Sequence, residues 1–128
     1  MKLFITSLLC ITLLLTISCK KDECTPGNLD TNIIGSWNVT SVAGDLGTVE
    51  FHANGTLVDS NNALIAAESM GQLLSEKTFM VPSNTTVHIH ASNTSGTTSI
   101  NNDYSVTSYT CNQIFVSLQG FNVILTRN

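Results

Sequence analysis

The sequence predicts an all-β domain built from antiparallel strands, arranged as a sandwich or a barrel. Apolar and polar residues alternate over several short segments, as they do in strands that bury one face. Turn signals rich in Gly, Asn and Asp separate these segments at intervals of about 8–12 residues, a spacing typical of sandwiches and barrels. Only 11% of the residues are charged, whereas Ser, Thr and Asn are abundant. Such a composition is common on exposed strand faces and turns.

The expected strands follow from the alternation. The first expected strand places Trp37 and Val39 on one face. The second places Val49 and Phe51, which are two residues apart, on one face. Asn54-Gly55 is a strong signal for a hairpin turn after the second strand. The expected strands are residues 33–43, 48–53, 56–58, 86–91, 104–110, 113–118 and 121–126.

Three segments are predicted to lie outside the strands. Residues 44–47 read as a turn and residues 93–102 as a loop, because Gly, Asp, Asn, Ser and Thr dominate them. Between residues 61 and 74 apolar side chains recur at helical spacing, and Asn61 or Asn62 is placed to cap a helix. We therefore expect one short helix that covers an end of the sheet; a lid over a barrel mouth is the alternative.

The N-terminus has the layout of a secretory signal peptide. Lys2 supplies a positive charge, residues 3–17 are almost entirely apolar, and Ser18 is a small residue at the expected cleavage point. The apolar run is shorter than the roughly 20 residues that span a bilayer. An uncleaved membrane helix is the alternative.

Residues Thr16-Ile17-Ser18-Cys19 resemble the lipobox of bacterial lipoproteins, although Thr16 stands where Leu is usual. The resemblance implies removal of residues 1–18, a diacylglyceryl group on the Cys19 thiol, and acylation of the new amino terminus, for example with palmitate. Since each buried CH₂ contributes about 0.8 kcal/mol, two or more chains hold a domain firmly on a membrane. Residues 20–23 (Lys-Lys-Asp-Glu) are similar to a tag that sends some outer-membrane lipoproteins to the cell surface; a charged linker is the alternative.

Three short motifs resemble the lipocalin-like domains of bacterial lipoproteins. Gly35-Ser36-Trp37 matches the Gly-x-Trp of their first strand, residues 51–56 match their Phe-x-x-x-Gly-Thr hairpin, and residues 121–127 are similar to their last strand. The segment from about residue 61 to residue 81 has no counterpart. The resemblance implies an antiparallel lipocalin-like β-barrel with one short helix.

The same resemblance sets the expected domains and function. Residues 19–32 would be a lipidated linker and residues 33–128 the barrel, anchored in the outer membrane by its lipid. We expect a non-catalytic protein that binds a small apolar ligand inside the barrel, lined by Trp37 and Phe51. Side chains often fill small barrels completely. The alternative is therefore a solid-core module that binds a protein or a glycan at its surface.

Composition excludes nucleic acid as an expected partner. Without residues 1–18 the chain keeps four basic and nine acidic residues, a formal charge of −5, and such a surface does not attract phosphate backbones. Catalytic motifs such as Gly-x-Ser-x-Gly, a phosphate loop or His-Glu-x-x-His are absent from the sequence. We expect neither enzymatic activity nor a cofactor.

Cysteines and histidines are the remaining chemical groups of interest. Cys24 and Cys111 form an even pair for an exported domain, so a disulfide between them is expected, with two free thiols as the alternative. His88 and His90 share one strand face and could chelate a metal, with His52 as a conceivable third ligand. Because the opposite face is apolar, we expect these histidines to face solvent and to bind no metal.

Overall fold

The computed structural model describes residues 27–128. The predicted signal peptide, the lipidation site Cys19, residues 20–23 and Cys24 lie outside the described residues. The elements are α1 (Leu29–Asn32), β1 (Gly35–Ser41), β2 (Gly44–Phe51), β3 (Leu57–Val58), β4 (Glu68–Ser69), β5 (Gln72–Leu73), β6 (Glu76–Ser83), β7 (Thr86–Ser92), β8 (Ser99–Tyr109), β9 (Gln113–Leu118) and β10 (Phe121–Arg127). No helix among these residues is both long enough and apolar enough to cross a membrane.

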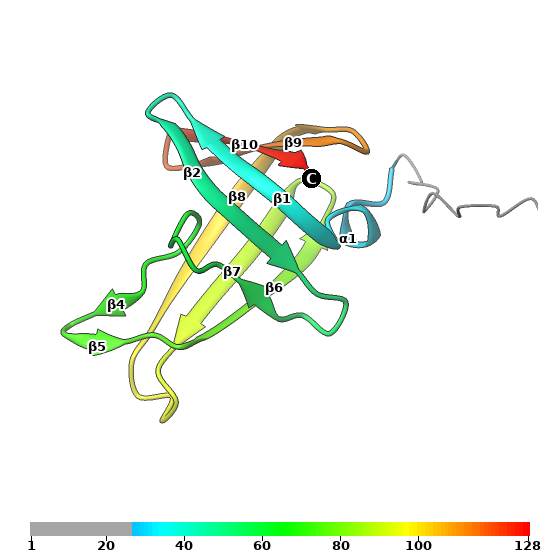
Figure 1. Cartoon of the computed structure of the whole chain (residues 1–128). Helices are drawn as coiled ribbons and strands as arrows, with labels where there is room; N and C mark the ends of the chain where they lie inside the picture. The colour runs from blue at the N-terminus through cyan, green and yellow to red at the C-terminus, as the bar shows by residue number, and fades with distance from the viewer. Residues whose placement is uncertain (1–26) are drawn as a thin grey trace, which may run out of the picture.

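Eight of the strands form one antiparallel sheet that closes almost completely into a barrel (Figure 1). The order is β3-β2-β1-β10-β9-β8-β7-β6, so the first and last long strands pair directly, from Trp37 with Arg127 to Ser41 with Val123. The end strands β3 and β6 meet at a single bridge between Thr56 and Thr78, beside which the Phe79 amide donates a hydrogen bond to the Gly55 carbonyl at 2.9 Å. The predicted antiparallel barrel is therefore confirmed.

Alternation along the strands fills the barrel. In β7, Val87, Ile89 and Ala91 are buried while His88 and His90, which alternate with them, are only partly buried, as a period of two requires. The helix α1 covers one end of the barrel with Leu29, which is fully buried. The side chain of Asn84 fixes the segment, because it accepts a hydrogen bond from the Leu29 amide at 2.9 Å and donates one to the Gly27 carbonyl at 2.6 Å.

The prediction of a helix over residues 61–74 is wrong, because the structure has no helix there. Residues 59–67 form an irregular segment, which we call the plug loop, and β4 and β5 form a hairpin that projects from the barrel on the side away from α1 (Figure 1). Met70 and Gly71 have φ values of 52° and 73° and make a tight hairpin turn, a conformation that no helix contains. The short helix of the fold is α1 instead.

Two further strand boundaries differ from those predicted. Residues 44–47, expected as a turn, begin β2, because the chain reverses already at Val42 and Ala43. Gly47 has a φ of 106°, and a Cβ there would lie 2.6 Å from the side chain of Asn61, so glycine lets the plug loop pack against this strand. The predicted loop over residues 93–102 is shorter than expected, since β8 already begins at Ser99.

Candidate functional site

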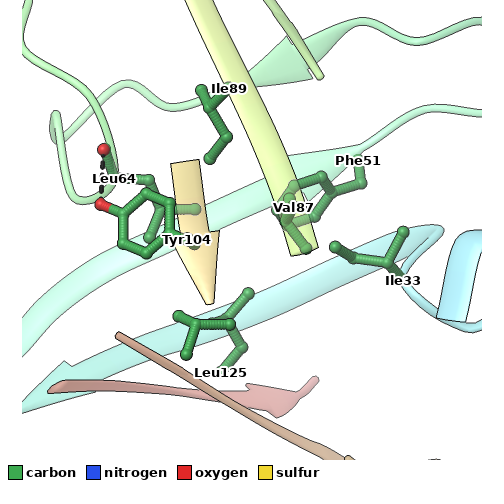
Figure 2. A pocket seen from close by; sticks show the side chains of 8 residues that line it. Ile33, Phe51, Leu64, Val87, Ile89, Tyr104 and Leu125 are labelled. Carbon is green, nitrogen blue, oxygen red and sulfur yellow. Dashed lines mark hydrogen bonds between the residues drawn. The ribbon is translucent and has the colours of Figure 1, made fainter. Parts of the chain in front are cut away.

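The interior of the barrel is nearly full. Within residues 27–128 a small interior cavity has a volume of about 10 Å³, and Figure 2 shows the side chains around it. Holding one water molecule takes at least roughly 10–15 Å³, and pockets for small molecules typically have about 300–1,000 Å³. The cavity is lined by Ile33, Phe51, Leu64, Val87, Ile89, Tyr104, Val116 and Leu125.

The two predicted ligand-binding residues occupy different places in the core. Phe51 lines the small cavity and packs edge-on against Phe79, with the ring centres 4.9 Å apart. Trp37 is fully buried away from the cavity lining. Its indole N–H donates to the Ile33 carbonyl at 2.7 Å, and the Arg127 guanidinium lies 4.3 Å from the ring centre. Trp37 thus ties the first and last strands of the barrel to the end of α1.

The plug loop closes the barrel by placing Leu64 and Ile65 in the core, where both are almost fully buried. The Leu64 carbonyl accepts a hydrogen bond from the Tyr104 hydroxyl at 2.7 Å (Figure 2) and a second one from the Asn102 side chain at 3.0 Å. Burial, together with the nearby Asp59 carboxylate, raises the pKa of Tyr104 to about 12. The hydroxyl therefore stays protonated and keeps donating to the loop.

A buried carboxylate organises the plug loop. Both oxygens of Asp59 accept backbone hydrogen bonds, from Ala63 at 2.7 Å, and from Leu64 and Ile65 at 3.0 and 3.1 Å. The Lys77 ammonium on β6 lies 3.9 Å from the Asp59 carboxylate and donates to Asn62 Oδ1 at 2.9 Å. The side chain of Asp59 has no exposed surface, so this ion pair is almost entirely shielded from solvent.

A groove of about 340 Å³ opens between the plug loop and the β4–β5 hairpin. Three of its polar side chains are already engaged, because Lys77 pairs with Asp59 and donates a hydrogen bond to Asn62. Two apolar side chains that line it are exposed, Val58 to 44% and Leu73 to 63%, and Met70 at the tip of the adjoining hairpin is 95% exposed. The groove is lined by Val58, Asp59, Ser60, Asn62, Ala67, Leu73, Leu74, Ser75 and Lys77.

The histidines lie on the outer face of the barrel, as the alternation predicted for His88 and His90. His88 Nδ1 is hydrogen-bonded to Asp103 Oδ1 on β8, and His90 Nδ1 to Asn101 Oδ1 at 2.7 Å. His52 lies elsewhere, with its Nε2 atom 3.6 Å from Glu50 Oε1. Among residues 27–128 no three His, Cys, Asp or Glu side chains are grouped to hold a metal, so the three histidines do not share one site.

Cys111 lies in the turn between β8 and β9, where its carbonyl accepts a hydrogen bond from Arg127 Nε at 2.8 Å. Because Cys24 precedes the described residues, the Cys24–Cys111 disulfide stays a prediction.

Comparisons with known proteins give no relative for this chain. No protein-family model, no curated protein and no solved structure matches it.

Proposed function

We propose that this chain is a lipid-anchored bacterial lipoprotein with a lipocalin-like barrel, held in the outer membrane through Cys19, that acts by binding a protein partner at its surface. The observation that supports surface binding is the packed interior, whose cavity of about 10 Å³ is far smaller than a pocket for an apolar ligand. This favours the solid-core alternative over a ligand enclosed between Trp37 and Phe51.

The exposed apolar side chains around the groove favour a protein over a glycan. Leu73 and Met70 extend from the hairpin into solvent, and Val58 stands on the adjacent edge of the groove. Exposed apolar side chains rimmed by polar ones are typical of protein interaction surfaces. The residues that line the groove include no aromatic ring on which a sugar could stack.

We expect a photo-crosslinking amino acid at Leu73 to form a discrete protein adduct in the native membrane. The matched control is the same amino acid at Val42, which is 94% exposed in the turn between β1 and β2. Adducts are detected by gel shift and identified by mass spectrometry. Equal adducts at both positions, or none at Leu73, would contradict a partner site at the hairpin.

The membrane anchor is tested by a Cys19→Ala substitution. Without the thiol no lipid can be attached, and we expect the domain to leave the membrane fraction in soluble form. Fractionation with an antibody against the barrel measures this, and Cys111→Ala is the matched control that should stay with the membrane. A Cys19→Ala chain that remains with the membrane would refute lipid anchoring.

A further inference from the structure

We propose that the outer face of β6 and β7 binds a copper ion between His88, His90 and Met80. The three side chains share one face, because they alternate with inward-facing residues in their strands: Val87 and Ile89 in β7, and Phe79 and Val81 in β6. The site is on the outside of the sheet, separate from the plug loop and its groove.

The hydrogen bonds of the two imidazoles leave the same nitrogen available on each ring. Asp103 Oδ1 and Asn101 Oδ1 act as acceptors, so Nδ1 carries the hydrogen in both histidines. In the neutral imidazole each Nε2 atom then carries a lone pair. A carboxylate or carbonyl oxygen on the second ring nitrogen is the arrangement that orients histidines as metal ligands and raises their basicity.

The spacing of the two imidazoles suits chelation. Residues two apart on a strand project from the same face about 6.6 Å apart at the backbone, and long side chains can converge from there on one ion. The adjacent strand β8 fixes both rings from the same side, since His88 pairs with Asp103 and His90 with Asn101 in the sheet register. Because the rings are already held in place, less conformational entropy is lost when a metal binds.

Met80 supplies the third donor and the preference for copper. It lies directly opposite His88 in the pairing of β6 with β7, and it is 60% exposed although methionine is normally a core residue. Side chains directly opposite each other have Cβ atoms about 4.5–5.5 Å apart. Thioether sulfur combined with imidazole is a soft ligand set that favours copper, above all Cu⁺. The sequence alone predicts no metal here, because it places neither Met80 nor the two acceptors beside the histidines.

The test is a titration of the full chain, purified in detergent with its thiols alkylated, with Cu⁺ in competition with a chromophoric chelator. We expect one Cu⁺ per chain. His88→Gln and His90→Gln should each weaken binding by more than about tenfold, since loss of an outer-shell partner alone typically costs about 10–100-fold. Met80→Leu should weaken Cu⁺ binding while leaving Ni²⁺ binding unchanged, because nickel does not depend on the thioether.

The chain offers matched controls for both ligand types. His52→Gln removes a histidine outside the site, and Met70→Leu removes a methionine that is 95% exposed at the hairpin tip. Both should bind Cu⁺ as the unmodified chain does. The proposal is overturned if no stoichiometric Cu⁺ binds, if the His88 and His90 variants bind like the unmodified chain, or if the controls lose binding equally.

Discussion

Replacing Asp59 by alanine is expected to lower the free energy of unfolding by about 3–5 kcal/mol, the range for breaking a buried ion pair. The substitution removes the acceptor of three backbone amides in the plug loop and leaves the Lys77 ammonium shielded without its carboxylate. Urea unfolding followed by the fluorescence of Trp37 measures the loss. Amide hydrogen exchange at Ala63, Leu64 and Ile65 should rise at the same time.

Asp45→Ala is the matched control for this prediction. The Asp45 carboxylate also accepts a backbone hydrogen bond, from the Gly47 amide at 2.9 Å, but it is exposed and holds no buried cation. Its loss should cost less than about 1.5 kcal/mol, the usual net value of one hydrogen bond. If Asp59→Ala cost no more than Asp45→Ala, the carboxylate would not be what holds the plug loop in the barrel.

Replacing Trp37 by alanine should also lower the free energy of unfolding by about 3–5 kcal/mol, as is usual for a fully buried aromatic residue. The indole fills the barrel next to α1, and its loss leaves a cavity and removes the ring face on which the Arg127 guanidinium rests. It also leaves the Ile33 carbonyl without its donor. Because the variant lacks the tryptophan, its unfolding is followed by circular dichroism.

Phe121→Ala is the control for loss of aromatic surface. Phe121 is 45% exposed at the start of β10, so its truncation should cost about 1 kcal/mol or less. Trp37→Phe keeps a ring beneath Arg127 and should retain part of the stability that alanine loses. A Trp37→Ala chain as stable as Phe121→Ala would contradict the role of this residue in joining the ends of the barrel.

Much of the barrel could be predicted because its signals are local. Alternation placed Trp37, Phe51, Val87 and Ile89 in the core, and Asn54-Gly55 marked a turn. The strand β6 was missed because Met80 interrupts the alternation: three apolar residues run together from Phe79 to Val81, and only the pairing with β7 turns Met80 outward.

The plug loop could not be predicted from local pattern. The apolar residues between Ala63 and Leu74 repeat at helical spacing, but Asp59 accepts hydrogen bonds from the backbone amides of residues 63–65, and the Met70-Gly71 turn reverses the chain. The lysine that pairs with Asp59 is 18 residues away in the sequence, and the acceptors for His88 and His90 become neighbours only through the register of β7 and β8. Such contacts between residues far apart in the sequence depend on the order and register of the strands, which the local sequence pattern does not predict.

The most direct test of the solid-core proposal is native mass spectrometry, which detects bound small molecules by their mass. The full chain is released from detergent in the presence of excess fatty acid. A barrel filled by the plug loop should show the mass of the polypeptide, with the lipid proposed on Cys19, and no stoichiometric adduct. Leu64→Ala is the matched variant, since truncation of this interior side chain should open a cavity that admits a small apolar molecule such as benzene. One tightly held fatty acid per unmodified chain would contradict the proposal and restore the barrel interior as the binding site.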